Sequence, residues 1–195
     1  MASYKGVQGA LVALEEFFKQ RLPADLSDEP VSASVTLLGS ADIAEALSGN
    51  LLGIYLHRIT IDPHGRTRTF SQQGTQQNGR QGELPVNLHF LLIANASSPT
   101  VEADLMAWAM LVLANENQID ISHVQGIDNE WAEREVLNIA PEEMSTEDLM
   151  RIWDVFESPY TSTVPYVART VRLRLTPQRS EGPPVITRVF PGGTL

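Results

Sequence analysis

The stretch from Ser145 to Leu175, STEDLMRIWDVFESPYTSTVPYVARTVRLRL, decides the fold. Ser145 is a suitable helix N-cap, because its hydroxyl can accept a hydrogen bond from the free amides of a first turn, and Asp148 three residues later forms a variant of the capping box. Apolar residues then recur at helical spacing, at Leu149, Ile152, Trp153 and Phe156. Pro159 and Pro165 exclude helix, and an alternating run follows. The stretch predicts a capped helix, a proline-marked turn and a long strand.

Helical and strand patterns also follow one another in the rest of the chain. Apolar spacing predicts an amphipathic helix over residues 3–21 and a more apolar one over residues 99–115. Runs of β-branched and aliphatic residues predict strands at 35–38, 51–62, 85–96, 119–124 and 135–139. Because crossover helices do not regularly separate these strands, we predict an α+β fold. It is a single domain with a mainly antiparallel sheet and helices packed on one face, and Trp153 and Tyr160 belong to its core.

Composition divides the chain into a domain, a long loop and an arm. Residues 1–175 form the predicted domain, and residues 63–84 within it are rich in glycine, glutamine and arginine. This loop has almost nothing apolar to bury, so it either stays solvated or becomes ordered on a partner. Residues 176–195 are punctuated by proline and glycine and form an extended C-terminal arm.

Charge is unevenly placed along the chain, which indicates either a solvated acidic face with a basic edge strand or complementary patches that meet between neighbouring subunits. Twelve acids lie between Glu116 and Glu157, whereas the arginines gather after Ser158. The alternation of the last strand predicts one mostly apolar face with Val167, Arg169, Val171, Leu173 and Leu175, and an outward face with Tyr166, Ala168, Thr170, Arg172 and Arg174. The β-prone island of the arm is expected to add as a strand to a neighbouring subunit. The predicted partner-binding residues are Arg66, Arg68, Arg80, Arg172, Arg174, Val185, Ile186, Thr187, Arg188, Val189 and Phe190.

Composition also excludes several classes of function. The net charge of −10 opposes general binding of nucleic acid, because phosphate neutralisation needs a basic surface. No apolar run has the length of a membrane span, and the N-terminus lacks the basic region of a Sec signal. Cysteine is absent, so thiolate metal sites and disulfides are excluded.

No motif indicates catalysis. The four histidines form no metal-binding pair in the sequence, so a zinc site would have to assemble in the fold. His57 and His89 are interpreted as satisfied or surface histidines on strands. No serine lies in a GxSxG motif, and the acid pairs near residues 142–148 suit a helix start rather than a cleft. We therefore predict no enzyme, no cofactor and no metal.

The same C-terminal stretch resembles a known family. Its pattern is carried by Leu149, Trp153, Pro159, Tyr160, Ser162, Val164, Tyr166, Arg169, Val171 and Leu173. It looks like the end of the cap, or tube-terminator, domain of phage-tail-like contractile injection systems, of the virulence-cassette and antifeeding-prophage type. The N-terminal helix and the strand PVNLHFLLIANA followed by a helix resemble the same layout. The long loop and the C-terminal arm depart from the pattern, and these are the parts expected to determine partner contacts.

The resemblance implies a structural role. It implies a homo-hexameric ring that ends growth of the inner tube and contacts the last sheath ring, with tube and sheath proteins as partners. It also implies assembly in the cytoplasm as part of a tail-like particle that cell lysis can release. Two alternatives stay open, which are a phage tail-completion or connector protein and an unrecognised hydrolase. Neighbouring genes for sheath and tube without capsid genes would favour the cap, and a closed pocket with convergent carboxylates would favour the hydrolase.

Overall fold

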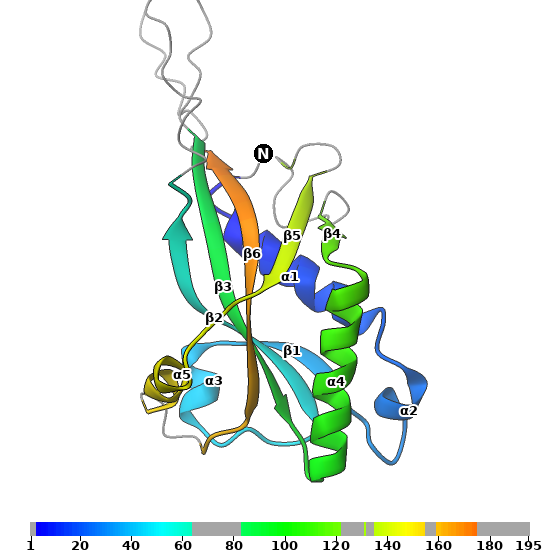
Figure 1. The fold of residues 1–195 in the computed structure, drawn as a ribbon. Helices are drawn as coiled ribbons and strands as arrows, with labels where there is room; N and C mark the ends of the chain where they lie inside the picture. The colour runs from blue at the N-terminus through cyan, green and yellow to red at the C-terminus, as the bar shows by residue number, and fades with distance from the viewer. Residues whose placement is uncertain (1–2, 64–82, 122–130, 132–134, 155–158, 175–195) are drawn as a thin grey trace, which may run out of the picture.

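The computed structural model of the protein describes residues 3–63, 83–121, 131, 135–154 and 159–174. These residues form a six-stranded sheet in the order β1-β2-β3-β6-β5-β4 (Figure 1). β1 and β2 are parallel, and every other neighbouring pair is antiparallel. The strands are β1 Ser34–Leu38, β2 Leu51–Ile61, β3 Glu83–Asn95, β4 Gln118–Asp120, β5 Val136–Pro141 and β6 Ser162–Arg174.

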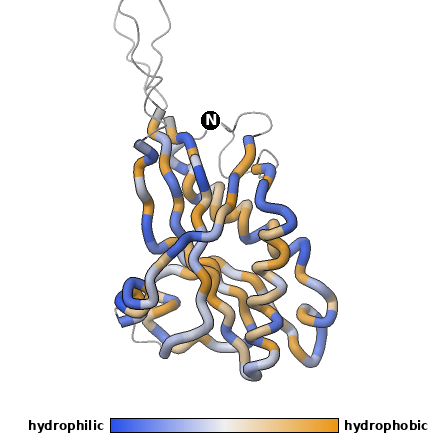
Figure 2. The backbone as a smooth tube through the Cα atoms, in the orientation of Figure 1, coloured by the Kyte–Doolittle hydropathy of each residue, from blue (hydrophilic) through white to orange (hydrophobic). Residues whose placement is uncertain are grey.

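Two long helices cover one face of this sheet and bury the main core. They are α1 Gly6–Lys19 and α4 Pro99–Asn115, and both contact the central strand β6. α1 turns its Phe18 inward, where it contributes to the core with Phe90 of β3 and Leu105 of α4. Hydrophobic residues concentrate along the central strands, whereas the small helix α5 is mostly hydrophilic on its visible side (Figure 2). The short helix α2 Ala24–Ser27 lies in the link between α1 and β1.

Two short helices lie on the opposite face and build a second, smaller core. They are α3 Ser40–Ala44 and α5 Thr146–Trp153. Ile43 of α3 and Trp153 of α5 pack with Leu91 and Ile93, the side chains that β3 turns away from the main core. Ser145 caps α5 as its sequence predicts, since its hydroxyl accepts from the backbone N–H of Asp148 at 3.1 Å.

Two irregularities in strand pairing shift the alternation of side chains. Between β2 and β3, Leu56 pairs with Phe90 and Arg58 with His89, so His57 is an extra residue. Between β3 and β6, Val86 pairs with Val171 and Leu88 with Ala168, which leaves Arg169 and Thr170 opposite the single residue Asn87. A bulge of this kind lets two successive side chains point to the same face. In both places that face is the one that carries α3 and α5.

The predicted fold class is confirmed, and the structure refines its details. The long helix predicted over residues 99–115 is α4 itself, and the strands predicted at 35–38, 51–62, 85–96 and 135–139 are all present. Packing of helices on one face holds for the two long helices only, because α3 and α5 cover part of the other face. Of the strand predicted over 119–124, β4 contains Ile119 and Asp120, and residues 122–124 lie outside the described residues. Most of the polar loop (64–82) and the arm (176–195) lie outside the described residues.

Two predictions about the C-terminal stretch are wrong in part. Tyr160 is not a core residue, because it is 54% exposed and only makes a T-shaped ring contact with Trp153. The faces predicted for β6 are reversed before the bulge, so that Tyr166 and Ala168 enter the main core while Val167 lies on the opposite face beside His89. Strict alternation cannot foresee this, since one inserted residue exchanges the two faces of everything before it.

Candidate functional site: a polar cluster on the outer face of the sheet

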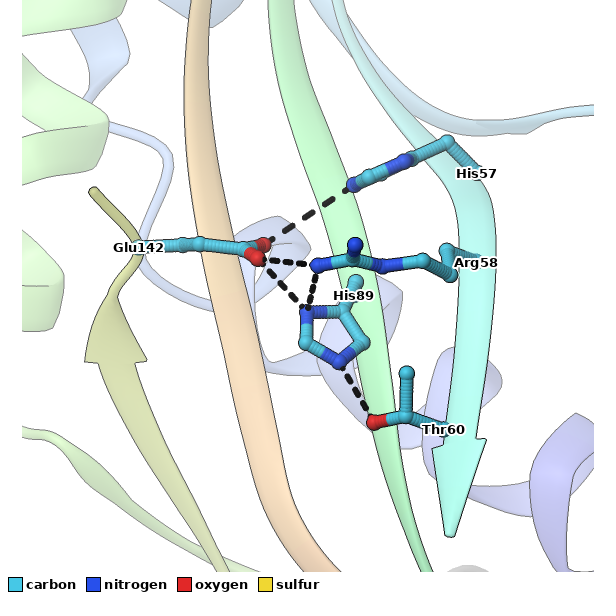
Figure 3. A network of polar contacts seen from close by, with 5 residues as sticks. All are labelled: His57, Arg58, Thr60, His89 and Glu142. Carbon is cyan, nitrogen blue, oxygen red and sulfur yellow. Dashed lines mark hydrogen bonds and ion pairs between the residues drawn. The ribbon is translucent and has the colours of Figure 1, made fainter. Parts of the chain in front are cut away.

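A mostly buried carboxylate, that of Glu142, is the centre of a polar cluster (Figure 3). Glu142 follows β5, and its backbone N–H donates to the carbonyl of Pro165 at 3.1 Å. Its Oε1 accepts from Arg58 Nη2 at 2.6 Å and lies 2.8 Å from His89 Nδ1. Its Oε2 lies 3.9 Å from His57 Nε2, close enough for an ion pair if that imidazole is charged. The cluster therefore joins β2, β3 and the segment that leads into α5.

The hydrogen bonds indicate which ring nitrogen of His89 acts as the donor. A carboxylate oxygen can only accept, so Nδ1 donates to Glu142 Oε1. The other ring nitrogen, Nε2, lies 2.8 Å from Thr60 Oγ1 and accepts from that hydroxyl when the imidazole is neutral. Arg58 Nη2 is 3.2 Å from His89 Nδ1 because both groups donate to the same oxygen. His89 is thus satisfied at both nitrogens, as the sequence led us to expect.

His57 is the member of the cluster whose polar atom is least well satisfied. Its side chain is 7% exposed and Glu142 is 13% exposed, whereas Arg58 is 52% exposed. Within the described residues, neither His57 Nε2 nor Glu142 Oε2 has a hydrogen-bond partner. Burial lowers the pKa of His57 below its usual value. The nearby Glu142 opposes that shift in pKa, and the positive charge of Arg58 and the neighbouring His89 add to it.

Because of this pKa, stability should fall in mild acid. A histidine whose pKa is lower in the folded state binds a proton more readily when unfolded, so its contribution is complete above about pH 6.5 and is lost as the pH falls through the folded-state pKa. Urea midpoints at pH 7.5 and pH 5 should therefore differ more for the wild-type chain than for His57→Gln. Equal pH sensitivity of the two proteins would contradict this reading of His57.

Two shallow hollows open on either side of the cluster and share Glu142 and Glu143. The smaller, of about 410 Å³, is lined by His57, Arg58, Glu142, Glu143, Met144, Asp148 and Ile152. The larger, of about 810 Å³, is lined by Asp62, Pro63, Asn87, His89, Pro141, Glu142, Glu143, Val167, Arg169 and Thr170. Both are open to solvent rather than enclosed. They present a mixture of acidic and basic groups, which suits a polar contact with a macromolecule better than the closed pocket of a hydrolase.

The described residues contain no group of three or more histidines, aspartates or glutamates arranged to hold a metal ion. The guanidinium of Arg58 donates to Oε1 of Glu142, and its positive charge opposes the binding of a cation beside that carboxylate. The cluster can instead fix the start of α5 on the sheet through charge-assisted hydrogen bonds. Within the part of the chain that the structure describes, no helix is both long and apolar enough to cross a membrane.

The structure places only some of the predicted partner-binding residues. Arg172 is exposed on β6, opposite Pro85, and Arg174 is the last residue of that strand, opposite Glu83. The remaining ones lie outside the described residues, namely Arg66, Arg68, Arg80, Val185, Ile186, Thr187, Arg188, Val189 and Phe190. Sequence reasoning did not single out the polar cluster. The signal for it was the interruption of an apolar strand by His57, Arg58 and Thr60.

Comparison with known proteins identifies the family. The family model described as the Pvc16 N-terminal domain matches residues 11–187, so the chain belongs to that family. No curated protein matches the chain. The suspected relationship to the cap, or tube-terminator, family is confirmed.

Two solved structures share the fold. One is described as the sheath/tube terminator of an extracellular contractile injection system, PVC, in the extended state, and it matches with a TM-score of 0.56 and 15% identity over 97% of this chain. The other is described as the tube-terminating cap of the anti-feeding prophage, with a TM-score of 0.58 and 14% identity over 93% of this chain. The alignments cover 64% and 59% of those longer chains. Both descriptions name a terminator or cap of a tube, and neither names an enzyme.

Proposed function

We propose that this protein caps the inner tube of a phage-tail-like contractile particle. The observation that carries the proposal is the match to the Pvc16 N-terminal domain over residues 11–187. The similarity in fold to a sheath/tube terminator and to a tube-terminating cap supports it. A tube grows by heterologous addition, in which each ring offers a surface to the next. A cap binds the last ring and offers no equivalent surface for another.

The proposed partners are further copies of the chain, the inner-tube protein and the last sheath ring. A hexameric ring would present one copy of each contact surface to each subunit of a six-fold tube. The acids between residues 116 and 157 and the arginines after residue 158 supply surfaces of opposite charge. The particle would assemble in the cytoplasm and leave the cell on lysis. Contacts to tube or sheath are assigned to the loop arginines Arg66, Arg68 and Arg80, together with Arg172 and Arg174 at the end of β6.

Native mass spectrometry should reveal a hexamer in moderate salt. The expectation follows from the closed symmetry that a tube end requires. Raising the salt concentration should weaken the ring, because screening reduces attraction between exposed charges. A strict monomer at every concentration, together with the absence of a ring from assembled particles, would exclude the proposed ring.

Deletion of residues 66–82 should leave the domain folded and impair capping. β2 and β3 are already paired up to Ile61 and Val86, and the Asp62 N–H donates to the carbonyl of Pro85 at 2.9 Å. A shortened connection can therefore close this hairpin without loss of core contacts. Circular dichroism and thermal melting measure the fold, and pull-down with tube and sheath proteins measures capping. Unfolding of the deletion variant would show that the loop is structural.

A further inference from the structure

The C-terminal half of β2 is an open edge of the sheet. β1 pairs with β2 only from Leu51 to Tyr55, whereas β2 continues to Ile61 with β3 on its other side. Within the described part of the chain, no strand pairs with the outer edge of residues 56–61. This half of β2 runs along the outer margin of the molecule (Figure 1). Its outward backbone groups are free to pair with another strand.

Two aliphatic side chains of this edge are exposed. Ile59 is 49% exposed and Ile61 is 50% exposed. Their partners across the strand pair, Leu88 and Val86, are almost completely buried, so the two isoleucines prolong the face of the main core outward. A long edge that carries exposed aliphatic side chains is a template for strand addition, and folded proteins normally cover it.

The chain itself contains a segment that fits the edge. β6 ends at Arg174 opposite Glu83, at the same end of the sheet as Ile61, and residues 175–195 follow. Val185, Thr187 and Val189 alternate with Ile186, Arg188 and Phe190, so one side of this island is wholly β-branched. That side suits Ile59 and Ile61. The other side would bring Arg188 to the smaller hollow, where the acids Glu142, Glu143 and Asp148 outnumber the single arginine, Arg58.

A neighbouring copy is a better source of this strand than the same chain. The connection between β2 and β3 leaves the sheet at the end where β6 finishes, and an arm that returned to its own β2 would have to pass around it. Connections at one end of a sheet avoid such crossings. The linking residues 175–184 can span about 35 Å when extended, enough to reach a subunit alongside. A donor arm and a distinct acceptor edge also make a heterologous contact, the kind that closes rings.

We infer that residues 185–190 of a neighbouring copy add a strand along Leu56–Ile61 of β2. This inference rests on the proposed ring, because it supplies the contact between adjacent subunits. The strand would pair with the free backbone groups and cover both isoleucines. Each subunit would then give one strand and receive one around the ring.

Engineered cysteines test the inference cleanly, because the chain has no cysteine of its own. Ile59→Cys is mixed with Val185→Cys, Thr187→Cys or Val189→Cys as separate single variants of the full chain, and the mixtures are oxidised. A disulfide needs Cβ atoms about 3.5–4.5 Å apart, so only true neighbours join. In at least one mixture we expect a reducible dimer that joins Ile59→Cys to the arm variant. The matched control, Asp25→Cys on α2, should form no such mixed dimer with any arm variant.

The outcomes separate this inference from the proposed ring. A ring in native mass spectrometry with no disulfide in any mixture overturns the inference and leaves the ring standing. A variant that carries both Ile59→Cys and an arm cysteine is also oxidised. If its disulfide forms only within one chain, the edge belongs to that chain's own arm, which also overturns the inference. A monomer with no mixed disulfide overturns both. The inference predicts in addition that removal of residues 180–195 lowers the hexamer fraction at least tenfold at low micromolar concentration.

Discussion

Replacement of Trp153 by alanine should lower the free energy of unfolding by about 3–5 kcal/mol, the usual cost of deleting a buried large aromatic side chain. Trp153 is 5% exposed and packs with Ile43, Leu91 and Ile93. This second core is small, and among the described residues no further layer covers α5 on the outer face of the sheet. Loss of the indole would therefore remove the buried apolar contact of α5 and leave only the partly buried Leu149 and Ile152 to hold it.

Urea denaturation measures this loss, and near-ultraviolet circular dichroism reports whether α5 detaches before the main core unfolds. Tyr160→Ala is the matched control, because that ring touches Trp153 but is 54% exposed. It should cost less than about 1 kcal/mol. A loss below about 1 kcal/mol for Trp153→Ala itself would mean that the tryptophan is not part of a core, and its role would then be contact with a partner.

Replacement of Glu142 by alanine should cost about 2–3 kcal/mol. Loss of one partner from a fully buried ion pair costs about 3–5 kcal/mol, and the half-exposed Arg58 reduces that figure because water can solvate it. His89 would also lose the acceptor for its Nδ1–H, a bond of 2.8 Å in the folded protein. The start of α5 should loosen, since Glu142 ties it to β2 and β3.

The neighbouring acid provides the control for this prediction. Glu143 is exposed, so Glu143→Gln should change stability by less than about 0.5 kcal/mol. Glu142→Gln should fall between the two, because an amide oxygen can still accept from His89 but no longer carries charge. Chemical denaturation at pH 7.5 measures all three. Equal effects of Glu142→Ala and Glu143→Gln would show that the cluster does not hold α5.

Local patterns in the sequence were sufficient to predict α1, α4, α5 and the strands, but not the short helices α2 and α3. The boundaries of α4 follow from a proline at its first turn and from continuous apolar residues, and the cap of α5 follows from Ser145. What local patterns could not give was the second core. Ile43 and Trp153 are more than a hundred residues apart, and neither sequence neighbourhood indicates that Leu91 and Ile93 lie between them.

The polar cluster was beyond sequence prediction for a related reason. Its members come from β2, β3 and the end of β5, and the bulge at His57 is what lets two successive side chains reach Glu142. Bulges depend on pairing with a partner strand, so the residues of one strand do not reveal them. The second bulge reversed the predicted faces of β6 before Arg169 by the same mechanism.

The length of inner tubes tests the central claim most directly. Inner-tube protein from the same particle is polymerised with and without this chain, and the tubes are measured by electron microscopy. If the protein is a cap, substoichiometric amounts should shorten the tubes in proportion to the protein added and leave a density at one end only. Tubes of unchanged length, with the protein either unbound or spread along their walls, would contradict the account.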